Sequence, residues 1–98
     1  MVINHIVKID PEYFDDVVNK VKKFEVRKND RNYKVGNIIE LREFNRKRNE
    51  YTGRTITAEI TYILDNEEYV KENYVIFALE ILDFNFETYL KAIFNYKW

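Results

Sequence analysis

The strongest constraint on this fold is the strict alternation of apolar and polar residues over 55–64. A period of two residues is typical of a β-strand with one buried face. The apolar positions that share this face are Ile56, Ala58, Ile60, Tyr62 and Leu64. After an acidic segment, residues 74–84 are almost continuously apolar, which predicts a central strand covered on both faces. Long strands therefore supply much of the expected core.

The N-terminal segments predict a strand followed by a helix. In the strand, residues 2–9, the side chains Ile3, His5, Val7 and Ile9 share one face. Asp10 is suited to the N-cap and Pro11 to the first helical position, so a helix begins there and ends near Lys20. Its apolar stripe is formed by Phe14, Val17, Val18 and Val21. His5 consequently lies among core residues, as a hydrogen-bonded core group or, less often, as a functional imidazole.

Two more strands are expected, at 24–28 and at 38–44. In the second strand two registers stay open: either Ile39 and Leu41 face the core, or the reverse register holds and Phe44 does. Segment 45–54 predicts a basic hairpin loop in which Gly53 supplies a positive φ. An aromatic stripe from Asn85 onward predicts a C-terminal helix. That helix packs on the sheet or, as an alternative, makes a homodimer interface.

These elements predict one α+β, mainly β domain spanning residues 1–98. Five strands and two helices without regular strand–helix alternation favour a sheet that bends toward a barrel.

Composition removes several function classes. The 98 residues include no cysteine, no serine and one histidine, which excludes disulfides, zinc fingers and Ser-His-Asp catalysis. We expect no metal and no cofactor. No apolar run is long enough to span a bilayer and the N-terminus lacks the pattern of a signal peptide, so a cytoplasmic protein is expected.

Charge is distributed unevenly along the chain. Residues 20–54 carry a net charge of +7 and the remainder a net charge of −8, although the whole chain carries −1. Such a division favours a basic surface that meets an anionic partner.

The segment 22–31 concentrates charge of both signs on a short strand followed by a turn. Alternation predicts that Phe24 and Val26 are buried while Glu25 and Arg27 are presented together on the other face. That face is the candidate site.

At this point the sequence resembles a known family. The resemblance is carried by His5, Lys8, Ile9, Lys22, Val35-Gly36 and the segments 11–14, 25–31, 41–43, 51–54 and 61–64. These residues are similar to the ASCH domains, small bacterial and phage proteins with a PUA-like β-barrel. Lys22, Glu25 and Arg27 match the signature Gly-x-Lys-x-x-Glu-x-Arg, but Lys20 replaces its glycine, which predicts a turn of different shape. Residues 85–98 lie outside the resemblance.

The resemblance implies a cleft between the barrel and the first helix that binds RNA or modified nucleic acid. We expect RNA as the ligand, in preference to DNA. Basic side chains would contact phosphates, and Tyr33 and Tyr51 would stack on bases or, equally, pack structurally. Glu25 would read a base edge or hold Arg27. The candidate binding residues are Lys22, Glu25, Arg27, Lys28, Arg31, Tyr33, Arg42, Arg46, Lys47, Arg48, Tyr51 and Arg54, with His5 and Lys8 as further cleft candidates.

Two alternatives belong to other classes. Some ASCH relatives resemble amidohydrolases acting on modified cytidine, in which the signature lysine activates a threonine. Here Lys22 is retained, but Glu25 occupies the position of the threonine, so catalysis would need Glu25 as a general base. The other alternative is a phage or bacterial inhibitor module that contacts a protein through the acidic segment 67–87.

Overall fold

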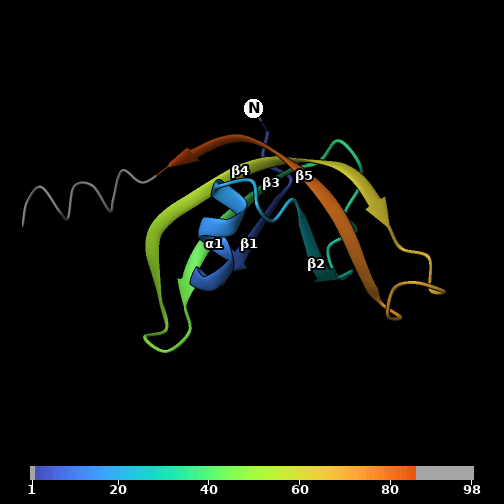
Figure 1. Cartoon of the computed structure of the whole chain (residues 1–98), viewed down its shortest axis with the longest axis horizontal. Coiled ribbons are helices and arrows are strands. Elements are labelled where there is room, and N and C mark those ends of the chain that lie inside the picture. Colours follow the sequence, from blue (N-terminus) through green and yellow to red (C-terminus); the bar gives the residue numbers. More distant parts are fainter. Residues whose placement is uncertain (1, 86–98) are drawn as a thin grey trace, which may run out of the picture.

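The structure is a computed structural model that describes residues 2–85. Five β-strands and one α-helix are formed within these residues (Figure 1). In chain order they are β1 (His5–Ile9), α1 (Pro11–Val18), β2 (Phe24–Lys28), β3 (Ile38–Asn45), β4 (Glu50–Leu64) and β5 (Tyr74–Asn85). The mainly β class and the helix after the first strand are confirmed. The predicted C-terminal helix lies outside the described residues, apart from Asn85, which ends β5.

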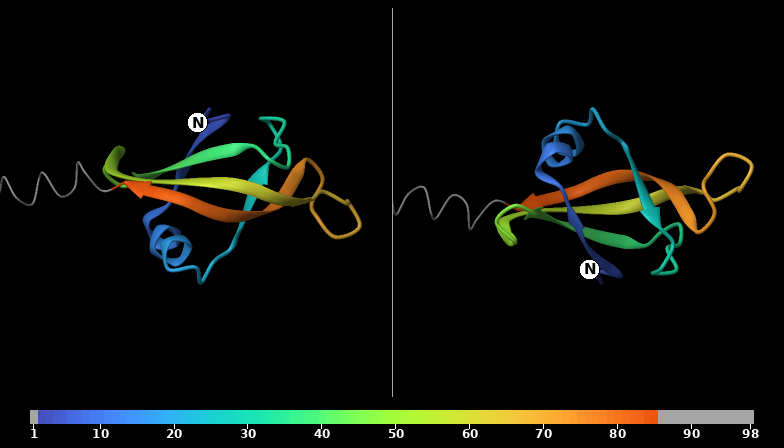
Figure 2. Two further views of the ribbon diagram at one scale, coloured as in Figure 1. Left: turned by 90° about the horizontal axis from the view of Figure 1, so that it is seen from above. Right: turned by 90° about the horizontal axis from the view of Figure 1, so that it is seen from below.

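The strands form one mixed sheet in the order β1-β3-β4-β5-β2. β1 runs parallel to β3, and every other neighbouring pair is antiparallel. The long β4 and β5 arch over the molecule, with α1 and β1 below one half and β2 below the other (Figures 1 and 2). The two edge strands thus border an open side, which we call the seam. The described chain is a curled half-barrel. The sheet bends as expected, but residues 2–85 do not close it into a barrel.

Register shifts accompany this curl. β4 and β5 are out of step between Thr57 and Ala58 and again between Ile60 and Tyr62. Another shift separates Arg42 from Phe44 where β3 pairs with β4. Irregularities of this kind bend a strand and increase its twist. The core fills the concave side of the resulting arch.

The core confirms the alternation of β4 at Ile56, Ala58 and Ile60, which are completely buried. Tyr62 was expected on the same face but is 65% exposed, because β4 and β5 shift register between Ile60 and Tyr62. Opposite the buried residues of β4, Ile39 and Leu41 in β3 are also fully buried. This settles the register of β3 that the sequence left open. The bulge after Arg42 then allows Phe44 to be buried as well.

α1 has only eight residues and depends on packing, because so short a helix is unstable alone in water. Phe14 and Val17 are fully buried, and each such side chain is worth about 1.5–3 kcal/mol. Pro11 occupies the first turn as expected. Asp10 stands at the N-cap but makes no side-chain cap bond, and its carboxylate accepts a hydrogen bond from Arg46 instead.

The end of α1 differs from the prediction. The helix stops at Val18, and Lys20 has a φ of 60°, in the left-handed region that favours glycine. The amides of Lys20 and Val21 donate to the carbonyls of Val17 and Asp16, which is a Schellman motif. Lys20 therefore adopts the left-handed conformation that favours glycine, the residue that the signature has at this position, and the expected change of turn shape stays a prediction. Val21 is 77% exposed and is not part of the apolar stripe.

Two strand predictions also need correction. β3 and β4 extend further than expected, so the hairpin loop is 46–49, and Gly53, with a φ of 93°, lies inside β4. β5 is not covered on both faces: Val75 and Phe77 are buried, whereas Leu82 and Phe84 are exposed. The described strands form a single sheet, so no second sheet covers the outer face of β5 within residues 2–85. Beyond Ala78, where its pairing with β2 ends, β5 also has a neighbouring strand on one side alone.

Candidate functional site

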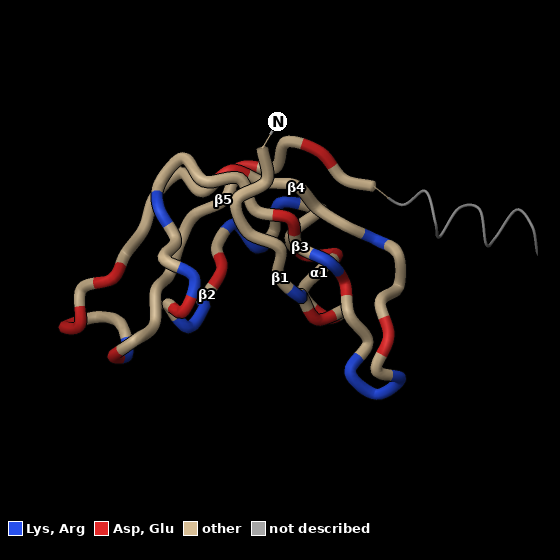
Figure 3. The backbone as a smooth tube through the Cα atoms, turned by 180° about the vertical axis from the view of Figure 1, so that it is seen from behind, with Lys and Arg blue, Asp and Glu red and all other residues tan. Residues whose placement is uncertain are grey.

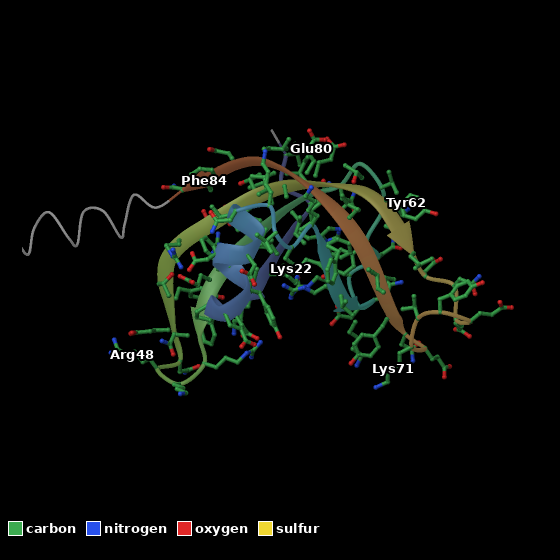
Figure 4. The ribbon with its side chains drawn as sticks, in the orientation of Figure 1. Lys22, Arg48, Tyr62, Lys71, Glu80 and Phe84 are labelled. Atoms are coloured by element: carbon green, nitrogen blue, oxygen red, sulfur yellow. The ribbon has the colours of Figure 1, made fainter. Side chains whose placement is uncertain are left out.

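A cleft of about 600 Å³ opens at the seam, and we call it the seam cleft. It lies where the end of β1 and the start of α1 face β2. Figure 4 shows Lys22 in this concavity, between α1 and β2. Its lining residues are Lys8, Ile9, Asp10, Tyr13, Lys22, Phe24, Glu25, Val26, Arg27, Lys28, Arg46 and Tyr74. Six of the predicted site residues therefore meet here: Lys8, Lys22, Glu25, Arg27, Lys28 and Arg46.

The predicted burial of β2 is reversed. Glu25 is 5% exposed, whereas Phe24 and Val26 are 48% and 52% exposed. Pairing with β5 explains this, because Glu25 and Arg27 are opposite the buried Phe77 and Val75 and so share the concave face. Alternation placed Glu25 and Arg27 together correctly, but on the wrong side of the sheet.

Glu25 is held between two cations. Lys22 Nζ donates to Glu25 Oε1 at 2.6 Å, and Arg27 Nε donates to Oε2 at 2.9 Å. Lys22 Nζ also donates to the carbonyl of Phe24 at 2.7 Å. Arg27 Nη2 reaches across the seam to the carbonyl of Lys8 in β1. Glu25 therefore fixes both cations, and Arg27 links the two edge strands.

These contacts still leave donors for a ligand. A lysine ammonium has three N–H donors, and two of those on Lys22 are used by Glu25 and Phe24. A guanidinium has five, of which Arg27 uses one for Glu25 and one for Lys8. Lys22 acts here as an ammonium donor, and Glu25 offers no hydroxyl group. The arrangement thus suits anion binding better than nucleophilic attack.

The seam cleft is strongly basic. Five cations line it against two carboxylates, a formal excess of three positive charges. Both carboxylates are already engaged, Glu25 as above and Asp10 with Arg46 Nε at 2.7 Å. Figure 3 shows basic residues on β2 and at the tip of the β3–β4 hairpin, while acidic residues gather on the loop between β4 and β5. The chain's charge division is thus partly reproduced in space.

Aromatic rings border the Lys22 ammonium. Its Nζ lies 5.4 Å from the ring centroid of Tyr13 and 4.9 Å from that of Phe24. Both residues are nearly half exposed, with Tyr13 at 43%. A hydrogen bond with Glu12, together with that carboxylate's charge, raises the pKa of Tyr13, so the phenol stays neutral. The sequence interpretation missed both rings, although Tyr13 stands outside the apolar stripe of the helix, which was the available signal.

Tyr33 belongs to the core, His5 is half-buried beside it, and neither residue lines the seam cleft. Tyr33 is 7% exposed, and its ring centroid lies 4.7 Å from that of His5 and 5.0 Å from that of Phe77. Burial raises the pKa of Tyr33 against the opposing charges of Arg27 and Arg31. His5 Nε2 is hydrogen-bonded to Asn37 Oδ1 at 2.8 Å. These contacts favour the structural alternative for both residues, and a role for either residue in ligand binding stays a prediction.

Arg54 likewise makes contacts that stabilise the fold. Its Nε and Nη2 donate to the two oxygens of Glu43 at 2.8 and 2.7 Å, and its Nη1 donates to Asp15 at 3.1 Å. Its guanidinium also lies 4.4 Å from the ring centroid of Phe14. This cluster ties α1 to β3 and β4, and its arginine is not a free phosphate ligand.

Glu43 is the buried partner in that cluster, at 2% exposure. Desolvation acts to raise the pKa of Glu43, but hydrogen bonds from Arg54 and Thr52, with the charge of Arg54, outweigh it and lower the pKa. The hydrogen bond to Glu43 in turn raises the pKa of Arg54.

The remaining predicted residues lie around the seam or away from it. Arg42 pairs with Glu40 at 2.6 Å and lines a different hollow, near Arg54. Lys47 and Arg48 are exposed at the hairpin tip, which Figure 4 marks with Arg48. Tyr51 and Arg31 border a second hollow of about 330 Å³, which we call the outer hollow. Its lining residues are Ile6, Val7, Lys8, Arg27, Arg31, Arg46 and Tyr51.

Two kinds of feature, a membrane-spanning helix and a metal site, are absent from residues 2–85. Their helix is too short to cross a membrane. Nor do these residues bring three His, Asp or Glu side chains together in a group fit for a metal ion.

Residues 4–79 match the model of a family described as a domain of unknown function, DUF3850. The chain belongs to this family. The match includes every lining residue of the seam cleft. The DUF3850 domain is also similar to a protein of Escherichia phage P2 described as "Uncharacterized 12.9 kDa protein in GpA 3'region", with 39% identity over 72 residues. Those residues are 74% of this chain and 63% of the phage protein, so the chain spans less than two thirds of that relative.

Proposed function

We propose that this DUF3850 domain binds nucleic acid in the seam cleft, single-stranded RNA in preference to DNA, and that its half-barrel is a PUA-like fold of the ASCH type. One observation carries the proposal: five cations and an exposed tyrosine ring surround a single cleft whose carboxylates are already neutralised. The preference for RNA comes from the ASCH resemblance alone.

The geometry suggests a separate role for each residue of the seam cleft. Lys28 is exposed and takes part in none of the ion pairs among the described residues, so its charge is available to a phosphate. Each neutralised phosphate releases counterions, and affinity should therefore fall steeply with salt. The ring of Tyr13 offers a face to an unpaired base, a contact worth about 1–3 kcal/mol. Glu25 acts indirectly, by holding Lys22 and Arg27 in place.

Fluorescence anisotropy with labelled single- and double-stranded RNA and DNA, over a salt series, tests the proposal. Substituting Lys22 or Arg27 would leave Glu25 buried without a full set of partners, so a lost signal could reflect unfolding. We therefore choose Lys28→Gln and Tyr13→Ala. The matched controls are Lys34→Gln and Tyr62→Ala, because both residues are exposed and neither lines the cleft.

We expect Tyr13→Ala to weaken binding about fivefold or more, and Lys28→Gln to reduce the salt slope by about one. Both controls should bind like the wild type. If none of the four nucleic acids binds even at low salt, the proposal is wrong. Turnover of an acylated cytidine would instead favour the hydrolase alternative, and a protein complex that survives high salt and nuclease would favour the inhibitor alternative.

A further inference from the structure

The outer hollow adjoins the seam cleft. The two share Lys8, Arg27 and Arg46. Along β1, the outer hollow uses Ile6 to Lys8 and the seam cleft uses Lys8 and Ile9, with Asp10 just beyond the strand. Together they follow the edge strand for about 10 Å at about 3.3 Å per residue. That length is about three times the rise of about 3.4 Å per nucleotide along one strand of a stacked duplex.

The outer hollow is more one-sided in charge than the cleft. Its lining includes Lys8, Arg27, Arg31 and Arg46 and no carboxylate. Arg31 is exposed and takes part in no ion pair within residues 2–85. Like charges gathered in this way favour an anionic ligand that neutralises them.

Packing and hydrogen bonds hold some of the cations of the outer hollow in place. Lys8 Nζ lies 4.0 Å from the ring centroid of Phe44 and 5.9 Å from that of Tyr51. Those two rings pack edge-to-face at 5.0 Å, with Phe44 7% exposed. Arg27 is fixed by Glu25 and by the carbonyl of Lys8. Two of its four cations are thus held by contacts with the sheet.

We propose that the outer hollow is a phosphate subsite for the same strand that occupies the seam cleft, so that the ligand is an oligonucleotide lying along β1 and not a single nucleotide. One base contacts the cleft at Tyr13, and a neighbouring phosphodiester lies among Lys8, Arg31 and Arg46. This inference rests on the proposed function. It adds that the ligand is longer than one nucleotide and that it lies along β1.

Anisotropy with two labelled probes, uridine monophosphate and a short oligouridylate, tests this arrangement. Arg31 lines the outer hollow and not the cleft, so Arg31→Gln separates the two sites. We expect it to weaken oligouridylate binding several-fold and to lower its salt slope by about one, while uridine monophosphate binding stays unchanged. Lys34→Gln, three residues away on the same loop, should change neither.

The outcomes separate the two proposals. If Tyr13→Ala weakens oligouridylate binding but Arg31→Gln behaves like Lys34→Gln, the outer subsite is wrong and the seam cleft stands. Equal loss of monophosphate and oligonucleotide binding in Arg31→Gln also overturns the subsite, because the effect would then act on the cleft. If the wild type binds no oligouridylate, the outer subsite is wrong, and the proposed function is then decided by the four nucleic acids of the earlier test.

Discussion

Among single residues, Glu25 shapes the seam most. A buried carboxylate is costly unless charged donors replace its lost water, and Glu25 has two such donors on different segments. Lys22 approaches from the turn after α1, and Arg27 from β2 itself. The carboxylate thereby keeps two cations at the edge of the cleft, which accounts for the spacing Lys-x-x-Glu-x-Arg in structural terms.

Lys22→Met tests this pairing. The side chain retains its apolar stem but leaves Glu25 Oε1 without its charged donor, so we expect unfolding free energy to fall by about 1–3 kcal/mol. Lys28→Met, at an exposed position without an ion pair, should stay within about 0.5 kcal/mol of the wild type. Urea unfolding measures both. Equal stability of the two variants would contradict the role assigned to Glu25.

Glu43 predicts a pH dependence. Because its pKa is lowered in the folded state, its ion pair with Arg54 stabilises the fold above the unfolded pKa of about 4.3. This contribution is lost as the pH falls through the lower folded pKa. Glu43→Gln should cost about 3 kcal/mol near neutral pH, and its deficit should shrink in acid as the wild type also loses the charge.

Urea unfolding across a pH series measures this deficit. Glu80→Gln is the control, because Glu80 is exposed on the outer side of the arch (Figure 4) and should cost little at any pH. A deficit for Glu43→Gln that stays constant into strong acid would show that the charge of Glu43 is not what stabilises the fold.

Among the elements, α1 ends in a turn where glycine would fit the backbone conformation better than Lys20 does. The Schellman motif needs a left-handed residue after the cap, and lysine adopts that conformation with strain. The turn matters for the site, because it directs the chain from the buried face of α1 to Lys22 and β2.

Lys20→Gly should therefore stabilise the domain. Relief of a left-handed conformation is worth about 1–2 kcal/mol, and the greater freedom of glycine in the unfolded chain offsets part of it, leaving a gain of about 0.5–1 kcal/mol. Lys34→Gly, at an exposed position without a positive φ, should instead destabilise the fold. Thermal unfolding compares them, and a loss of stability in Lys20→Gly would contradict the strain.

At the scale of the whole molecule, the half-barrel formed by residues 2–85 has an open side where its edge strands, β1 and β2, do not pair with each other. The hydrogen bond from Arg27 to the carbonyl of Lys8 crosses this seam. The half-barrel therefore keeps a cleft where a closed barrel would have paired strands, and a side chain joins the two edges.

Arg27→Lys tests whether that link holds the edges together. A lysine can still pair with Glu25, but its single ammonium cannot reproduce the fork that also reaches Lys8. We expect faster hydrogen exchange in peptides from β1 and β2, with β4 unchanged. Lys28→Arg is the control on the same strand. Unchanged exchange in β1 would show that the link contributes nothing to the seam.

The sequence by itself determined the local structure. Alternation located β4, Pro11 marked the start of α1, and the two-residue spacing placed Glu25 and Arg27 on one face. The charge division indicated where cations would gather, and four of the five that line the seam cleft come from residues 20–54. These features depend on neighbours in the chain, so the sequence contains them directly.

Only the tertiary structure decided which face of each strand is buried and which side chains meet. A strand has two faces, and the pairing of Glu25 with Phe77 on β5 turned the charged face inward. Contacts between distant segments assigned Tyr33 to the core and Arg54 to Glu43, and brought Lys8 to Arg27. Such contacts depend on how the sheet curls, and no periodicity in the sequence specifies that curl.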